Sequence, residues 1–392
     1  MAALSGATDD RLDRRGWRRA WIAYAVAHFG KSLLWTASDL LTLYLLVSVH
    51  AVDPIVAGAL FLAGLAANAG ADMGVGIWLE KRPHHAAALA ATALVLAAFS
   101  FPATVLLAPY GPWMLLAATL AFRVSYAGCD VPHNALLTRL GSDPGRATWL
   151  ARWRTIGTAL ASLSAAWVAS SDAVAITPLL CGIAVAALVV GSAMVPLLAA
   201  FPLDPGPRRS GTAVGLPLPF LAASIIGIVA LGALAKAVLH LPAPASGTSV
   251  LMLLITGRTL SAFLPIRIGS PRRGLMLLAA TSGGAAAVAP GFAFGAAPGM
   301  LVLLGLSLGA TNLVGWALLP AMADGPGSYG LYTMTSKLAL GAAGLALAGG
   351  LGRSPAFSSD GFARFAWIVA VACIVAALLA GLRLTSPAVR RF

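Results

Sequence analysis

Nine charged side chains fall inside long apolar stretches of the sequence, where an ionised group is costly. Six are cations and three are acids: Lys31, Arg123, Arg154, Lys236, Arg258 and Lys337, with Asp39, Asp72 and Asp130. A charge at the centre of a lipid bilayer costs about 2.5–3.5 kcal/mol even on the mildest scale. These groups must therefore pair with one another, face an interior cavity, or reach an interface along their stems, an alternative that concerns Arg154 and Lys236 most.

The first cluster has the spacing of a helix. Lys31, Trp35 and Asp39 are four residues apart in turn, so they share one helical face. A ring between two charged groups suits a polyol, because the ring can stack on an apolar sugar face while the charges bond hydroxyls. The alternative is a buried Lys–Asp pair that only packs this helix.

A second row of polar residues is the densest in the chain. Its members follow spacings of three, four and four residues, namely Arg123, Tyr126, Asp130 and Asn134. Gly128 and Pro132 can kink this helix and free backbone carbonyls for polar contacts. The alternative role of Arg123 is to neutralise Asp130. A lone histidine beside them, His133, is more typical of a structural residue.

A third pair concerns cations. Asn68 and Asp72 are four residues apart, and oxygen ligands on one face suit a hard cation such as Na⁺. A buried aspartate also suits a proton carrier. The alternative is that Asp72 pairs permanently with a cation from another helix. Lys337 is the one charge of its own apolar stretch, so it needs a partner, which we expect on the first, second or fourth helix.

The composition decides which elements carry these residues. Hydrophobic residues make up 59% of the 392 residues, charged residues only 10%, and mean hydropathy is +0.88. This excludes a soluble enzyme, a disordered chain and a nucleic-acid binder. Twelve stretches are long enough to span a membrane. They are Trp21–Val49, Pro54–Leu79, Ala86–Ala108, Gly111–Leu140, Leu150–Ser170, Ala173–Phe201, Ala213–Leu241, Thr248–Ile268, Gly274–Phe294, Gly299–Met322, Tyr329–Leu351 and Phe362–Leu382.

The basic residues that lie outside these spans or within one turn of a span's end predict the orientation. They gather in the tail before the first span and in the loops after each even-numbered span, such as Lys81–Arg82 and Arg272–Arg273. The other side holds Arg353 and Arg364. By the positive-inside rule, both termini are predicted to be cytoplasmic, in the cytoplasmic (inner) membrane.

A polar stretch in the middle divides six spans from six. We predict a tail over 1–20, a bundle over 21–201, a central loop over 202–212, a second bundle over 213–384 and a tail over 385–392. Each half has a short basic loop between its second and third spans, as two parallel repeats would. The predicted fold is therefore an all-α membrane protein with twelve transmembrane helices in two six-helix parallel repeats, the major facilitator fold.

The sequence carries no motif for catalysis or a cofactor. It has no phosphate-binding loop, its histidines are scattered, and its three cysteines lie in apolar runs. We expect no enzyme activity and no cofactor. Without an ATP site, uphill transport must draw on an ion gradient of H⁺ or Na⁺. The expected partners are the bilayer and a small-molecule solute, with the chain acting as a monomer.

Four stretches resemble the glycoside–pentoside–hexuronide:cation symporters, the melibiose-permease family of the major facilitators. They are His28–Trp35, Phe61–Asp72, Tyr126–Leu136 and Trp316–Gly341. The resemblance implies a sugar site that includes Lys31, Asp130, Asn134, Arg154, Lys337, Tyr126 and Trp316, with Asp72 in the cation site. Two positions depart from the family: Asn68 and Ser32 stand where its members have carboxylates, which weakens a sodium site. The remaining acid pair, Asp72 and Asp130, favours proton coupling, with an uncoupled facilitator as the alternative.

These observations predict a secondary transporter that moves a sugar or related small organic solute by alternating access, through cation symport. Alternatives remain open. Six intramembrane cations against three acids favour an anionic solute. The architecture also suits proton-coupled export of an amphipathic or lipid-like compound, and a membrane sensor or scaffold is a third class.

Overall fold

The computed structural model describes residues 14–169, 173–203, 215–238, 247–351 and 358–384. The predicted tail residues before 14 and after 384, most of the predicted central loop, and parts of two predicted spans (residue 170 of the fifth, and residues 213–214 and 239–241 of the seventh) lie outside these ranges. Within them the chain forms thirteen α-helices.

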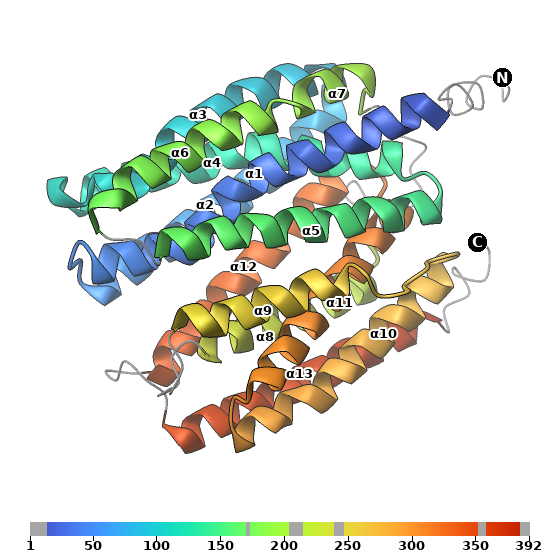
Figure 1. Ribbon diagram of the computed structural model, residues 1–392. Helices are drawn as coiled ribbons and strands as arrows, with labels where there is room; N and C mark the ends of the chain where they lie inside the picture. Colours follow the sequence, from blue (N-terminus) through green and yellow to red (C-terminus); the bar gives the residue numbers. More distant parts are fainter. Residues whose placement is uncertain (1–13, 170–172, 204–214, 239–246, 352–357, 385–392) are drawn as a thin grey trace, which may run out of the picture.

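Seven helices, α1 to α7, form the first half of the molecule, and six, α8 to α13, form the second (Figure 1). The bounds of the first set are α1 (Arg14–Ser48), α2 (Pro54–Lys81), α3 (Ala86–Leu106), α4 (Pro112–Leu140), α5 (Pro144–Ala169), α6 (Ala173–Gly191) and α7 (Met194–Ala200). Those of the second are α8 (Leu218–Ala237), α9 (Gly247–Ser261), α10 (Pro271–Val288), α11 (Pro298–Met322), α12 (Pro326–Leu351) and α13 (Ser359–Leu384).

Prolines set where many of these helices begin. The first helical position needs no N–H donor, so proline fits there and presets the backbone angle. Pro54, Pro112, Pro144, Pro271, Pro298 and Pro326 occupy that position. Asp53 accepts hydrogen bonds from the backbone of Ile55 and Val56 and so caps α2.

The two halves contact each other through reciprocal helices. The second helix of the first half, α2, packs on α12, the fifth of the second half, and α5 packs on α9 in the same exchanged way. Two halves related by a pseudo-twofold axis produce this pattern. The predicted all-α membrane fold with two parallel repeats is thus present.

Three predicted spans differ in detail. The sixth breaks at residues 192–193 into α6 and α7, because Pro196 has no N–H to continue the helical ladder. The eighth ends at Ser261, because Pro265 disfavours helix just before it. The first begins at Arg14 rather than Trp21: arginine is a good helix former, and Trp17 packs on Trp21 at 6.3 Å.

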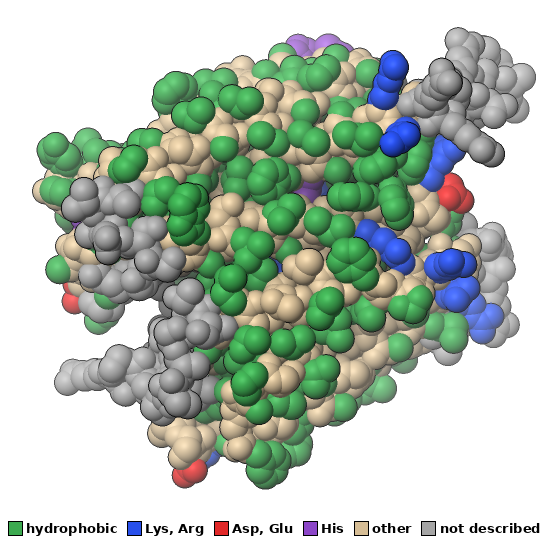
Figure 2. Space-filling view, viewed as in Figure 1, with side chains coloured by type: hydrophobic (Ala, Val, Ile, Leu, Met, Phe, Trp, Pro, Cys, Tyr) green, Lys and Arg blue, Asp and Glu red, His purple; other side chains and the backbone are tan. Residues whose placement is uncertain are grey.

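The outer surface is apolar along the middle of the molecule. On the face in Figure 2, hydrophobic side chains cover the helices, and the blue lysines and arginines gather at the end where α1 begins. Eight helices in the described ranges are long and apolar enough to cross a membrane by length and composition. The long helices outside this group, α1, α5 and α12, carry Lys31, Arg154 and Lys337, which lower their hydropathy.

Candidate functional site

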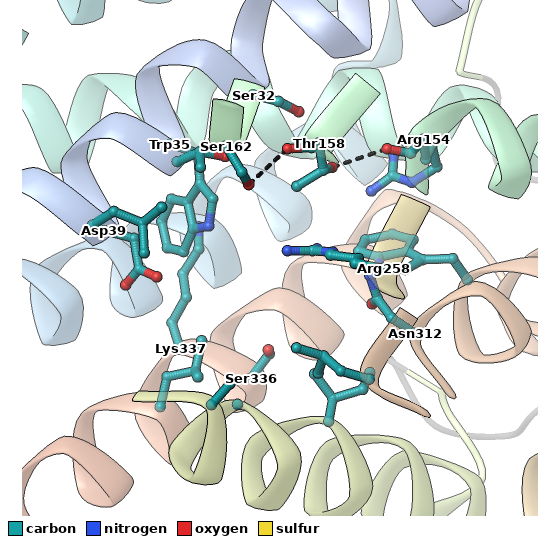
Figure 3. A pocket seen from close by; sticks show the side chains of 18 of the residues that line it. Ser32, Trp35, Asp39, Arg154, Thr158, Ser162, Arg258, Asn312, Ser336 and Lys337 are labelled. Carbon is teal, nitrogen blue, oxygen red and sulfur yellow. Dashed lines mark hydrogen bonds between the residues drawn. The ribbon is translucent and has the colours of Figure 1, made fainter. Parts of the chain in front are cut away.

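A cavity of about 280 Å³ lies between the two halves. Helices α1, α4 and α5 line it from the first half, and α8, α9, α11 and α12 line it from the second (Figure 3). All eight side chains predicted to bind solute face this cavity: Lys31, Trp35, Tyr126, Asp130, Asn134, Arg154, Trp316 and Lys337. The residues selected from the sequence therefore lie around one cavity. That each of them binds solute stays a prediction.

The first half contributes a buried polar network at the base of the cavity. The Lys31 ammonium donates to Asp130 Oδ1 at 2.5 Å and to Asn134 Oδ1 at 2.7 Å. Asn134 in turn donates to the same Asp130 oxygen at 3.0 Å. Arg154 Nη1 donates to Asn134 Oδ1 at 2.9 Å and to the Tyr24 hydroxyl at 2.8 Å. One chain of charge-assisted bonds thus joins α1, α4 and α5.

Lys337 connects the second half to this network. Its ammonium lies 2.5 Å from Asp72 Oδ2 on α2 and 3.6 Å from Asp130 Oδ2 on α4. The side chain is only about 5% exposed, and Asp72 is fully buried. The expectation that Lys337 finds its partner on the first, second or fourth helix is confirmed. This ion-pair triad spans the boundary between the two halves.

Aromatic rings flank the charged groups. Trp35 and Tyr126 lie with ring centroids 5.5 Å apart, and the Lys337 ammonium lies 5.0 Å from the Trp35 centroid. On the opposite wall the Arg154 guanidinium stacks 3.8 Å from the Trp316 ring. A ring can therefore stack beside hydrogen-bonding charges from either half, the arrangement that a polyhydroxylated solute requires.

Of the three predicted cation-coupling residues, Asp130 lines the cavity, whereas Asn68 and Asp72 lie outside its lining. Asp72 reaches the site through Lys337. Asn68 donates to the backbone carbonyl of Arg123 and so ties α2 to α4. One carboxylate oxygen of Asp72 and the amide oxygen of Asn68 are buried without a hydrogen-bond partner in the described part of the chain.

Arg123 does not neutralise Asp130, so that alternative is wrong. Its guanidinium is buried among three rings of its own half, 5.1 Å from Trp35, 5.4 Å from Phe61 and 5.5 Å from Phe122. A spacing of seven residues separates two side chains by about 10.5 Å along a helix, which is too far for contact. His133 is also a packing residue, stacked on Tyr24 at 4.4 Å.

The cavity is closed on the side where α1 begins and α13 ends, called here the termini side. There the Thr138 and Tyr329 hydroxyls hydrogen-bond at 2.8 Å, and Arg152 donates to the carbonyls of Leu264 and Ile266 across the halves. The Gly327 amide donates to Glu80 at 3.1 Å. On the other side, called the far side, the half-buried pair of Lys236 and Asp39 joins the halves at 3.1 Å.

Several lining residues were not selected from the sequence. Arg258 on α9 was counted as an intramembrane cation but received no role, although it lines the cavity opposite Trp35 (Figure 3). Asn312 and Ser336 also face the chamber. The sequence could have indicated these residues only as single polar side chains in apolar helices. Which of them face the cavity is shown by the packing of α9, α11 and α12.

Solved structures with the same fold are known. The chain is similar to a bacterial homologue of the iron transporter ferroportin in an outward-facing state, with TM-score 0.64, 15% identity, and coverage of 94% of this chain and 99% of that chain. It is similar to the major facilitator superfamily proton:xylose symporter XylE bound to 6-bromo-6-deoxy-D-glucose, with TM-score 0.63, 12% identity and coverage of 92% and 95%. It is also similar to the human organic anion transporter MFSD10, with TM-score 0.61, 12% identity and coverage of 94% and 98%.

No protein-family model and no curated protein sequence matches this chain. At these identities the solved structures show the fold alone, which is that of the major facilitator superfamily. The narrower resemblance to the glycoside–pentoside–hexuronide:cation symporters stays a prediction.

Proposed function

We propose that this chain is a proton-coupled secondary transporter, acting as a monomer, that carries a sugar or related small organic solute across the cytoplasmic membrane. The observation that carries this proposal is the triad of Lys337, Asp72 and Asp130 at the cavity. Lys337 is buried and interacts with two carboxylates of the other half. If either carboxylate loses its negative charge, the attraction that holds the lysine there becomes weaker. Solute binding and movement of the halves are thereby connected.

The solute binds, in this proposal, where the aromatic rings and the polar network meet. Trp35 and Trp316 offer apolar faces, and Asp130 Oδ2 can accept a hydrogen bond from a hydroxyl, while Asn134 has one amide N–H beyond the one that it donates to Asp130. The cavity volume of about 280 Å³ lies just below the range of about 300–1,000 Å³ for drug-sized ligands. A monosaccharide-sized compound fits this space better than a lipid-like compound does.

The proton acts at Asp72. Protonation removes the negative charge that holds Lys337 on α2 and leaves the lysine with Asp130 alone. The same stretch of α2 is where α12 packs most closely, because a side chain on Gly330 would lie 2.5 Å from the Asp72 carbonyl oxygen. Loss of the ion pair therefore loosens the contact that closes the termini side, and the halves can reopen there.

Sodium is the weaker candidate for coupling. The Lys337 ammonium already lies 2.5 Å from Asp72, so a sodium ion would have to displace a covalently attached cation. Asn68 also supplies a neutral amide where a second carboxylate would strengthen a sodium site. A proton needs no such space.

The test uses purified protein in two steps. A solute panel is screened by thermal shift, since a ligand that binds only the folded state must raise Tm. Solutes that bind are then tested in proteoliposomes under a pH gradient or a sodium gradient. We expect a sugar-like solute to accumulate with the pH gradient, and Asp72→Asn to keep solute exchange while losing accumulation.

Asp360→Asn serves as the matched control, because Asp360 is an exposed acid at the start of α13. It should accumulate solute as the wild type does. Asp130→Asn should abolish binding. Full accumulation by Asp72→Asn, or accumulation that follows sodium and ignores pH, would contradict proton coupling through this residue.

A further inference from the structure

The cations of the cavity are not all neutralised. Lys31 pairs with Asp130, Lys337 with Asp72 and Asp130, and Lys236 with Asp39, which uses every carboxylate that the described spans contain. Arg154 and Arg258 also line the cavity, and neither contacts a carboxylate within the described ranges. The chamber therefore carries surplus positive charge at its two arginines.

The two arginines differ in what holds them. Arg154 donates to Asn134 and Tyr24 and stacks on Trp316. Arg258 has no hydrogen-bond, ion-pair or ring partner in the part of the chain that the structure describes, and its Nε is buried and unpaired. In Figure 3 its side chain reaches into the cavity from the side of Asn312 toward Trp35.

The helix that carries Arg258 holds it firmly. Gly257 and Gly305 let α9 and α11 approach so closely that a side chain on either would overlap the other helix's backbone. A Cβ on Gly305 would also lie 3.0 Å from the Arg258 backbone nitrogen. This close contact with α11 restricts rotation of α9, so the Arg258 side chain stays directed into the cavity.

Arg258 is only half-buried, its Nε lies buried without a partner, and the planar fork of a guanidinium matches a carboxylate. We propose that Arg258, with Arg154 beside the same chamber, binds the carboxylate of the transported solute, so that the substrate class is a small organic carboxylate. This inference rests on the proposed transport function and narrows it. The ring surfaces of Trp35 and Trp316 and the polar side chains of Asn312 and Ser336 are left for the uncharged part of the solute.

The experiment compares acids with neutral counterparts of the same shape. Purified full-length protein is screened by thermal shift against uronates, aldonates and aromatic carboxylates, each beside its methyl ester or amide, and binding compounds are tested for uptake in proteoliposomes. We expect at least one carboxylate to bind about tenfold or more tightly than its neutral counterpart, the usual scale of a charge-assisted bond. Arg258→Gln should lose that preference, and Arg258→Lys should keep part of it.

The control removes a charge without touching the cavity. Lys81 is exposed at the end of α2, so Lys81→Gln should leave the preference unchanged. A second readout separates binding from a structural role. If Arg258 only stabilises the fold, Arg258→Gln lowers Tm without ligand, whereas removal of an unpaired charge leaves the ligand-free Tm unchanged or higher.

Each outcome decides between the proposals. If neutral compounds bind and are transported as well as the acids, or if Arg258→Gln keeps the preference, the carboxylate assignment is overturned while the transport function stands. If no compound of either kind binds or is transported, the assignment and the proposed transport of small solutes fail together.

Discussion

The two halves of the molecule carry very different charges in the membrane interior. The first half holds three acids and three cations, whereas the second holds three cations and, among its described span residues, no acid. Lys337 and Lys236 therefore cross to carboxylates of the first half, whereas Arg258 forms no ion pair among the described residues and is attracted only from a distance by Asp39, which already pairs with Lys236. The halves attract each other through these ion pairs, and the proposed carboxylate solute would balance the charge that remains on the second half.

The largest expected effect comes from breaking the bridge between the halves. Lys337→Met leaves Asp72 as a buried charge without its partner, which costs about 3–5 kcal/mol of stability. The double variant Asp72→Asn with Lys337→Met removes both charges and should recover most of that loss. Thermal and denaturant unfolding in detergent measure the two changes.

The double variant also separates stability from function. We expect it to fold and to lack pH-driven accumulation, because the shared lysine is gone. If the double variant is as unstable as Lys337→Met alone, Asp72 is not the group that Lys337 neutralises. Accumulation at the wild-type level would show that the ion pair only packs the halves.

A second prediction concerns the close packing of α2 and α12. Gly330→Ala places a methyl group against the Asp72 backbone, and overpacking of this kind costs about 1–3 kcal/mol. In the proposed alternating access this contact separates when the termini side opens, so the variant should favour opening there. Spin labels at Arg139→Cys and Arg267→Cys, exposed on opposite halves, should move apart.

Gly344→Ala is its control on the same helix, since a side chain there meets open space. It should leave the label distance unchanged, with an unfolding midpoint equal to or slightly above that of the wild type, because alanine favours a helix over glycine. Equal label distances in Gly330→Ala and in the wild type would show that this contact does not hold the termini side closed.

Much of this arrangement could be predicted from the sequence, and the reasons for success and failure are physical. The apolar spans and the need of Lys337 for a partner follow from the cost of a lone charge in lipid. That cost does not say which residue is the partner in each ion pair. Lys31 and Asp39 share a face but lie about 12 Å apart along the helix, so each pairs with another helix. The role of Arg258 depends on which face of α9 meets α11.

A third prediction stays within the first half. Arg123 contacts Trp35, Phe61 and Phe122, all on helices of that half. Arg123→Lys loses the planar stack on these rings and should cost about 0.5–2 kcal/mol of stability. Because no contact between the halves changes, solute affinity should remain within about twofold of the wild type, a change of less than 0.5 kcal/mol.

Arg139→Lys, an exposed change on the same helix, is the control for Arg123→Lys. Thermal unfolding and solute titration are measured on both. A large loss of affinity in Arg123→Lys with unchanged stability would mean that Arg123 acts on the solute through Trp35. A buried cation of the first half would then contribute to solute binding, as Arg258 of the second half is proposed to do.

The smallest effect is expected at the far side. Asp39 and Lys236 pair at 3.1 Å, but their side chains are 20% and 30% exposed, so water screens the attraction. A double-mutant cycle with Asp39→Asn and Lys236→Gln should give a coupling energy below about 1 kcal/mol, well under that of Lys337 and Asp72. Loss of this pair should favour opening on the far side, opposite to Gly330→Ala. A coupling energy as large as that of Asp72 and Lys337 would show that the two ion pairs hold the halves together equally strongly. A change of charge on Asp72 alone would then not be enough to open the cavity.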